Sequence, residues 1–410
     1  MEQLLREIGG DVSSNRHIRF QALTRVHFLR WVILPAMEER GQSHTALLAF
    51  ESNFDGTLED HLAELIAVGG QALQDIYVNC QGYPAVAAKG GHEPEALRAF
   101  LLRHQLPTAA FYRAYPHLSV ARIRRNTRVW KAVQAFLDDP AHRERLRRLP
   151  PEQIVAAIQQ HVSALPGVAL DEEQTSSMSV VDRATRLLME SRPVQVALVV
   201  VAGPVLVPLL IPPALYLRWK ESRDAVDPKR SDTAAEDVVD QEDWRLQNQL
   251  THVVEVKPGL FRRITLNAVL GAINFLARHY YDRGALGGIT SIHFARWVLI
   301  DHGRRLLFLS NYDGSWERYL GDFIDRASAG LTSVWSNTAG FPRTLFLLFR
   351  GATDEQRFKQ WARDHQVFTQ VWYSAHTEES VGNILENAEL VTKLKARLSS
   401  QEAQQWLLSL

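Results

Sequence analysis

Val26-His-Phe-Leu-Arg-Trp-Val-Ile33 recurs later in the chain as Ile292-His-Phe-Ala-Arg-Trp-Val-Leu299, with His, Phe, Arg and Trp in one register. Downstream, Ser52-Asn-Phe-Asp-Gly56 corresponds to Ser310-Asn-Tyr-Asp-Gly314, and the spacing between the two signatures and the segments beyond them is kept. Self-similarity over this length is the sign of a duplicated structural unit. The sequence therefore predicts a tandem repeat.

Length and composition fit this organisation. A chain of 410 residues is long enough for two or three domains, because single cores usually stop growing before about 250 to 300 residues. The 46 basic and 46 acidic residues cancel, so the charge does not indicate a nucleic-acid partner. The single cysteine, Cys80, is compatible with a reducing compartment, and the N-terminal sequence lacks the apolar run of a secretory signal.

Local patterns in the second copy predict an α+β unit. Two short apolar runs flank Asp301-His-Gly303, which indicates a hairpin, and apolar residues at helical spacing follow it. The expected order is strand 292–300, strand 305–312, helix 316–335, buried strand 344–349, helix 354–365 and strand 369–374.

This order is the layout of a ferredoxin-like α/β sandwich, with helices on one face of an antiparallel or mixed sheet. The predicted fold is therefore two tandem ferredoxin-like repeats, which could pack face to face as an internal pseudo-dimer. The predicted parts are the first repeat 17–127, a basic helical connector 128–192, a membrane segment 193–217, a flexible linker 221–245, the second repeat 246–390 and a C-terminal helix 391–410.

The segment Pro193–Leu217 carries no charge and is long enough to cross a bilayer core, which takes about 20 apolar residues. Tyr216 and Trp219, with basic residues at both ends, are typical anchors at a membrane interface. A buried core helix is the alternative. The Arg-rich stretch 120–162 is either a solvated helical face or a surface attracted to anionic lipid.

Four prolines disfavour a straight helix in this segment. A kinked single span would place the repeats on opposite sides of the membrane. A re-entrant hairpin, turning near Gly203-Pro204 or Pro212-Pro213, would keep both on one side, and it is favoured because repeats that pair need a common compartment.

The polar residues shared by the repeats are the candidates for chemistry. His27 and Arg30, like His293 and Arg296, lie three apart, so a regular strand would point them to opposite faces. Asp55 and Asp313 precede a helix, where they are expected to act as caps or as catalytic carboxylates. His104 and His365 end helices, which favours capping.

The second copy, SIHFARWVLID…RLLFLSNYDGSWERYLGDFID…WSNTAGFPRT with the preceding NQLTHVVEVKPG, resembles a bacterial domain of poorly defined function found alone or joined to peroxidase-like modules. It is more distantly similar to the dimeric α/β-barrel superfamily of dye-decolourising peroxidases and chlorite dismutases. That resemblance implies haem binding. The peroxidase motif GxxDG is matched only by Asp-Gly, because Ser52 and Ser310 replace its first glycine.

Two functions follow as hypotheses. One is a membrane-attached accessory or binding protein for a lipid, an apolar small molecule or a redox protein, with its soluble domains in the cytoplasm. The other is a haem-dependent peroxidase-like oxidoreductase with Asp313, Arg296 and His293 as catalytic residues. The ligand-binding candidates are Asn311, Tyr312, Trp297, His365, Asp55, Asn53, His27 and Arg30.

Overall fold

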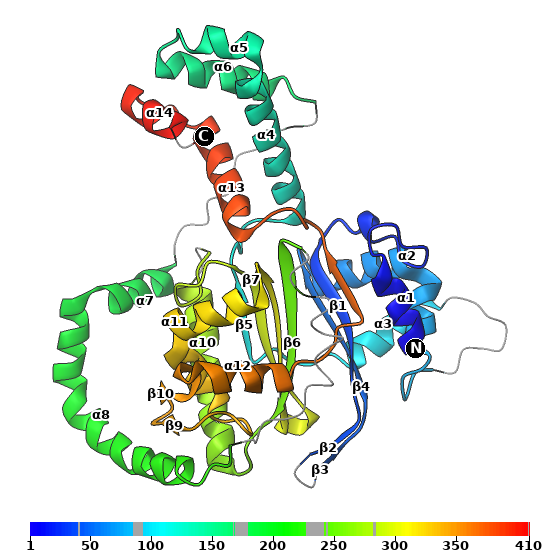
Figure 1. Ribbon diagram of the computed structural model, residues 1–410, viewed down its shortest axis with the longest axis vertical. Coiled ribbons are helices and arrows are strands. Elements are labelled where there is room, and N and C mark those ends of the chain that lie inside the picture. The colour runs from blue at the N-terminus through cyan, green and yellow to red at the C-terminus, as the bar shows by residue number, and fades with distance from the viewer. Residues whose placement is uncertain are drawn as a thin grey trace. The chain divides into compact units, whose positions relative to one another are not determined.

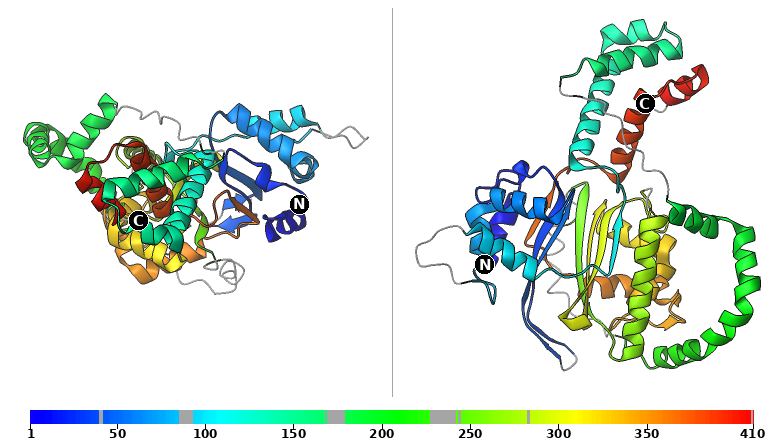
Figure 2. Two further views of the ribbon diagram at one scale, coloured as in Figure 1. Left: turned by 90° about the horizontal axis from the view of Figure 1, so that it is seen from above. Right: turned by 180° about the vertical axis from the view of Figure 1, so that it is seen from behind.

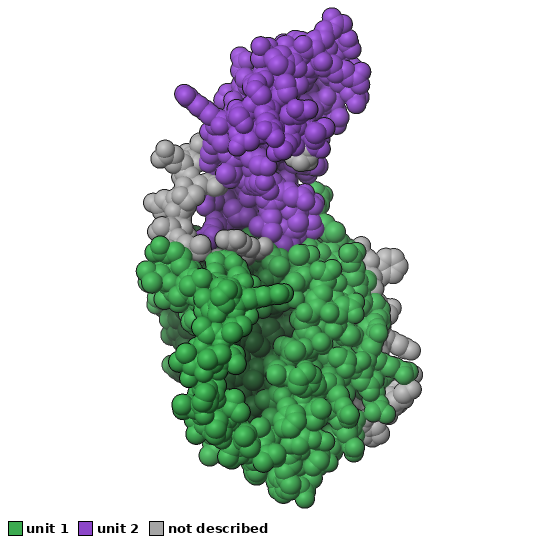
Figure 3. Space-filling model, turned by 90° about the vertical axis from the view of Figure 1, so that its left-hand side faces the viewer, with its two compact units in different colours: residues 1–116, 178–378 green, residues 117–177, 379–410 purple. Residues whose placement is uncertain are grey.

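The computed structural model describes residues 1–39, 42–84, 93–166, 168, 179–226, 242, 245–281, 284–408 and 410. The chain forms two compact units, one of residues 1–116 and 178–378 and one of residues 117–177 and 379–410 (Figure 3). Helices combine with several small antiparallel sheets, so the predicted α+β class is confirmed.

The first unit contains two main sheets, and each takes one edge strand from the other copy of the repeat (Figure 1). The first sheet has the order β11-β1-β4, formed by Val371–Ser374, Val26–Leu34 and Leu47–Phe54. The second has the order β5-β7-β8-β6, formed by Ala110–Arg113, Ile292–Ile300, Arg305–Asp313 and Gln247–Glu255.

This exchange is the same in both directions. The backbone N–H of Ala375 donates to the carbonyl of His27 at 2.9 Å, and that of Ala114 donates to the carbonyl of His293 at 2.9 Å. Neither copy completes a sheet by itself, so the two copies are interlocked rather than merely adjacent.

Most elements predicted for the second copy are present. The hairpin of β7 and β8 turns through η3, Asp301–Gly303, where Gly303 has a φ of 80° that glycine adopts without steric cost. The predicted helices are α11, Trp316–Trp335, and α12, Glu355–Asp364. The last predicted strand contains β11.

The predicted buried strand 344–349 is wrong. These residues form a small separate hairpin, β9 Thr344–Leu345 with β10 Phe349–Arg350, and several of its apolar side chains are exposed. The edge of the sheet beside β8 is taken instead by β6, which lies upstream of the matched segment. A run of apolar residues alone does not show which strand will fill a sheet position.

The two main sheets pack against each other through aliphatic side chains. Val32 and Leu34 of the first sheet meet Val298, Ile300 and Leu307 of the second in one buried cluster. The remaining helices and short elements of this unit are α1 Glu2–Gly10, η1 Phe20–Ala22, β2 Met37–Glu39, β3 Gln42–His44, α2 Leu58–Tyr77, α3 Pro94–Arg103, α7 Val180–Glu190, α8 Arg192–Glu221, α10 Leu260–His279 and η4 Gly351–Thr353.

The second unit is helical. Two of its helices, α4 Val120–Asp138 and α13 Val381–Lys395, pack against each other and begin in the same way. The side chains of Ser119 and Ser380 each cap the helix by accepting a hydrogen bond from the backbone N–H three residues later. Their shared core includes Val129, Val133 and Val391. The remaining helices of the unit are α5 Pro140–Leu146, α6 Pro151–Ser163 and α14 Ser400–Leu407.

The apolar segment lies in α8, a single helix of 30 residues that continues through both Gly203-Pro204 and Pro212-Pro213. The turn expected at one of these two sites for a re-entrant hairpin is therefore absent from the helix. Pro204, Pro208 and Pro212 follow at four-residue intervals on one face, so their kinks add in one direction. The helix accordingly curves as a bow (Figure 1). Most of the predicted linker 221–245 lies outside the described residues.

Candidate functional site

An irregularity in each central strand decides where the shared polar residues point. The register shifts between Val26 and Phe28 in β1, and between Ile292 and Phe294 in β7. The extra residue in each bulge is the histidine, and such a residue changes the alternation of the side chains that follow. The expectation that histidine and arginine face opposite sides is therefore wrong, because both reach residues of the other sheet.

Each of these histidines binds the aspartate of its own repeat. Nε2 of His27 lies 3.0 Å from Oδ1 of Asp55, and Nε2 of His293 lies 2.7 Å from Oδ1 of Asp313. Two roles are expected for these aspartates, helix cap or catalytic carboxylate. The first is wrong, because Thr57 and Ser315 hold the cap positions.

Tyr115 of the first copy joins the pair in the second copy. Its hydroxyl lies 2.8 Å from Nδ1 of His293, and burial raises the pKa of this phenol well above its ordinary value. The Tyr115 hydroxyl and Nδ1 of His293 share one hydrogen bond, and Nε2 of the same ring shares another with Asp313. The buried Tyr115 and His293 and the partly buried Asp313 thus link the two repeats in series.

His376 of the second copy takes the corresponding place beside His27, where the other group has a tyrosine. Its ring centroid lies 5.4 Å from that of His27, which also packs 5.3 Å from the ring of Phe294. Phe28 packs 5.3 Å from the ring of His293 and 5.6 Å from that of Phe294. The two histidine–aspartate pairs therefore share one aromatic cluster between the sheets.

Arg30 crosses between the sheets beside this cluster. It is 1% exposed, and its Nε lies 2.9 Å from Oε2 of Glu51 on the neighbouring strand. Burial lowers the pKa of its guanidinium, and the Glu51 carboxylate acts in the opposite direction. The other guanidinium nitrogens donate to the Gln249 amide, the Leu250 carbonyl, the Thr251 hydroxyl, the Ser310 carbonyl and the Asn311 amide.

Arg296 is the equivalent residue, but it is bound less fully. Its Nη2 lies 3.1 Å from the Asn53 amide oxygen, its Nε lies 3.6 Å from Glu51, and its guanidinium lies 4.5 Å from the ring centroid of Phe111. The predicted catalytic group is therefore divided. His293 and Asp313 are brought together, whereas Arg296 binds the other repeat.

The other predicted ligand-binding residues serve the packing of the first unit. Asn311 accepts from Arg30 and from the Trp372 indole, and Asn53 donates to Glu51. Tyr312 stacks on Tyr319, and Trp297 packs on Phe308. His365 ends α12 and His104 ends α3, each with Nδ1 2.8 Å from the carbonyl four residues earlier, in agreement with capping.

Sequence reasoning missed several residues of this region. Tyr115 and His376 stand at matching positions of the duplicated last strand, a signal that comparison of the copies already contains. Glu51 precedes the matched signature and has no charged counterpart, since Leu309 occupies that place. His252 on β6 is buried among Trp335, Trp361 and His365, and burial holds the pKa of its imidazole well below the ordinary value.

The histidines of the two histidine–aspartate pairs are not placed to ligate a haem iron. A histidine ligand needs a ring nitrogen that opens on a slot wide enough for the macrocycle. Both ring nitrogens of His293 are hydrogen-bonded, and the rings of Tyr115, Phe294 and His376 pack around His27. No cluster of three potential metal-ligating side chains occurs within the described ranges.

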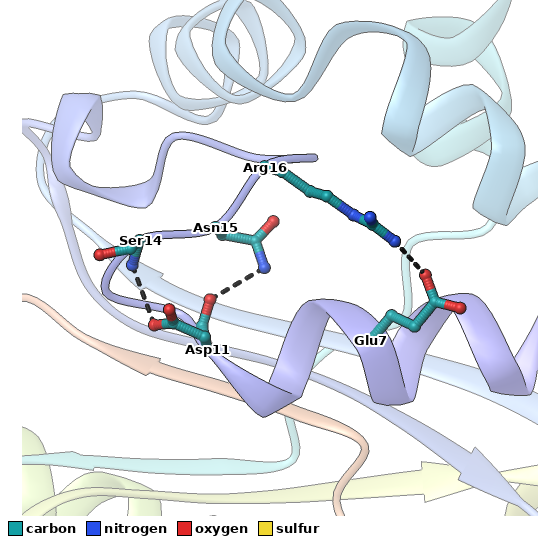
Figure 4. A pocket seen from close by; sticks show the side chains of 5 residues that line it. All are labelled: Glu7, Asp11, Ser14, Asn15 and Arg16. Carbon is teal, nitrogen blue, oxygen red and sulfur yellow. Dashed lines mark hydrogen bonds and ion pairs between the residues drawn. The ribbon is translucent and has the colours of Figure 1, made fainter.

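A polar pocket lies at the N-terminus, away from these residues in sequence (Figure 4). Its lining groups bind one another: Arg16 pairs with Glu7 at 2.8 Å, and the backbone of Asp11 accepts from Asn15 at 2.9 Å. These contacts stabilise the turn after α1.

No protein-family model matches the chain, and comparisons with curated proteins and with solved structures give no match.

Arg30→Met is expected to lower the free energy of unfolding by about 3 kcal/mol or more, because it leaves Glu51 and five acceptors, four of them buried, without their common donor. Arg25→Met is the matched control, since Arg25 forms an exposed ion pair with Asp60 worth less than about 1 kcal/mol. Denaturant unfolding of the first unit measures both changes. Equal, small losses would show that Arg30 does not hold the sheets together.

Tyr115→Phe is expected to destabilise the protein by about 1 to 3 kcal/mol, because Nδ1 of His293 loses its buried hydrogen-bond partner. Tyr83→Phe is the control, since the Tyr83 hydroxyl has no hydrogen-bond partner among the described residues. Nitrogen NMR shifts of the His293 ring give an independent readout. Unchanged shifts in Tyr115→Phe would contradict the hydrogen bond between Tyr115 and His293.

Proposed function

We propose that this chain is a membrane-attached accessory protein that binds a lipid, an apolar small molecule or a redox partner, on a body of two ferredoxin-like repeats. The observation that carries the proposal is α8. Its most apolar 18-residue window has a mean hydropathy of 2.5, and none of that window is buried within the described structure. A helix that is apolar on all sides and covered by no protein needs an apolar solvent.

The ends of α8 have the residues that a membrane segment needs. Tyr216 and Trp219 stack at 5.6 Å near its C-terminal end, where aromatic rings favour the bilayer interface. Arg192 begins the helix, and Arg218 and Lys220 lie in its last turn. The second apolar helix, α10, packs on β5 and belongs to the folded body.

Both repeats lie on one side of the membrane in this proposal. Strands β5 and β11 are each hydrogen-bonded into the sheet of the other copy, and these bonds cannot form across a bilayer. The basic residues at both ends of α8 favour the cytoplasmic side. The single cysteine is compatible with that compartment.

Contacts at both ends of α8 support a re-entrant path. Before α8, Asp182 of α7 lies 2.7 Å from Nδ1 of His279 at the end of α10. After α8, Asp224 lies 2.6 Å from Arg262 at the start of α10. A helix of this length is about 45 Å long. If both of its ends lie at the same membrane surface, it enters the bilayer to a depth of at most about 22 Å. That depth is less than the roughly 30 Å thickness of the hydrocarbon core.

The contacts of the polar residues that occur in both copies favour binding over catalysis. His293 is bonded at both nitrogens, and Arg296 is held away from the His293–Asp313 pair. A general acid or base needs a proton site within reach of a substrate. These groups instead join one repeat to the other.

Replacement of Leu206 and Leu210 in α8 by lysine is expected to move the protein from the membrane fraction to the soluble fraction. Each charge near the centre of an apolar helix costs about 2.5 to 3.5 kcal/mol in a bilayer. Membrane pellets washed with carbonate measure the change.

The matched control is Leu102→Lys with Leu106→Lys, two partly exposed leucines outside α8 with the same spacing. It should remain in the membrane fraction. An equal distribution of the two double variants would reject α8 as the attachment element.

Thiols placed in the two repeats are expected to react from the same side of sealed vesicles. Glu59→Cys and Glu317→Cys, each made in a Cys80→Ser background, place single thiols at well-exposed positions of the first and second copies. Labelling with a membrane-impermeant maleimide gives the sidedness. Reaction of one position from outside and the other only after lysis would establish a single span.

A further inference from the structure

The hairpin of β9 and β10 exposes an unusually apolar tip. Residues 345–349 read Leu-Phe-Leu-Leu-Phe, and the side chains of Phe346, Leu348 and Phe349 are 39%, 49% and 59% exposed. The same composition made this segment look like a buried strand. Exposed apolar clusters of this kind mark contact surfaces.

The shape of the tip is held by one buried carboxylate. Oε1 of Glu221 accepts from the Thr344 hydroxyl at 3.0 Å and from the backbone N–H of Leu347 at 2.9 Å, and Oε2 accepts from that of Phe346 at 2.9 Å. Phe346 and Leu347 have φ values of 52° and 64°, a left-handed conformation that costs roughly 1 to 2 kcal/mol per residue. The Glu221 carboxylate therefore stabilises a left-handed backbone conformation that Phe346 and Leu347 would otherwise disfavour.

Glu221 is also the last residue of α8, so it joins the tip to the membrane helix. It follows the interface residue Trp219 by two positions, about 3 Å along a helix. A loop bound at that position lies at the depth of the bilayer interface whenever α8 is in the membrane. In Figures 1 and 2, β9 and β10 lie on the side of the first unit that faces α8.

The neighbouring surface has the same character. α10 begins beside the end of α8, where the rings of Phe261 and Tyr216 lie 4.9 Å apart. Leu260 and Ile264 on its first turns are 73% and 58% exposed. Exposed basic residues lie next to these apolar groups in the sequence, namely Arg263, Arg343 and Arg350. Exposed apolar side chains with arginine close by in the sequence suit acyl chains bordered by anionic headgroups.

We propose that residues 345–349 are a second membrane-inserting element, which enters the same leaflet as the C-terminal end of α8 and fixes the orientation of the body on the bilayer. This inference rests on the proposed membrane attachment. The occupant is the lipid bilayer, because the tip continues the surface formed by α8 and is bonded to its last residue.

The test places an environment-sensitive fluorophore on Leu348→Cys of the full chain in a Cys80→Ser background. The labelled protein is reconstituted into vesicles of phosphatidylcholine and phosphatidylglycerol, some containing lipid with a spin label near the headgroup end of an acyl chain. Glu59→Cys is the matched control position. We expect blue-shifted emission at position 348 and spin-label quenching several-fold stronger than at position 59.

Flotation of the same samples separates the two proposals. Protein that floats with the vesicles but shows equal quenching at positions 348 and 59 overturns the insertion of the tip and leaves the attachment by α8 intact. Protein that does not float overturns the attachment itself.

A second variant tests the role of the tip without a label. Leu348→Asp with Phe349→Asp keeps Glu221 and its hydrogen-bonded partners, so the hairpin backbone retains its support. We expect the variant to bind vesicles several-fold less tightly than the parent, with an unchanged unfolding transition in detergent. Equal vesicle affinity would contradict the inference.

Discussion

The architecture depends on the contacts that the Arg30 guanidinium makes with both sheets. A buried arginine is tolerated only when a carboxylate and several acceptors surround it, and these come from Glu51 in one sheet and from β6 and β8 in the other. Sliding one sheet past the other would strand the charge in an apolar layer. The cost of that alternative fixes the register of the two sheets, while the aliphatic cluster beside it supplies most of the cohesion.

The duplication explains why the two halves resemble each other and also why they differ. Both central strands carry a bulge at the histidine, and both histidines bind an aspartate at the end of the strand that pairs with them in the same copy: Asp55 just after β4 and Asp313 as the last residue of β8. The residue completing each group differs, with Tyr115 in one place and His376 in the other. The two copies therefore differ in the residue that each lends to its neighbour.

Local patterns in the sequence predict much of the fold, because hairpins and amphipathic helices are determined by nearby residues. The hairpin of β7 and β8, α11 and α12 follow from spacing alone. The exchange of β5 and β11 could not be predicted, because the sequence of an edge strand does not indicate which sheet it joins. The bulges were equally hidden, and with them the side on which His27 lies. Of the three catalytic candidates, Asp313 and His293 lie within hydrogen-bonding distance of each other, whereas Arg296 lies against Glu51 of the other copy, a contact that local sequence does not indicate.

The strand exchange also sets the order of events during synthesis. β1 and its partner β11 are separated by more than three hundred residues, so the first sheet stays incomplete until nearly the whole chain has left the ribosome. α8 emerges well before β11. The N-terminal copy therefore still has an open sheet edge when α8 has been synthesised, and both sheets close only after the strands of the second copy have followed.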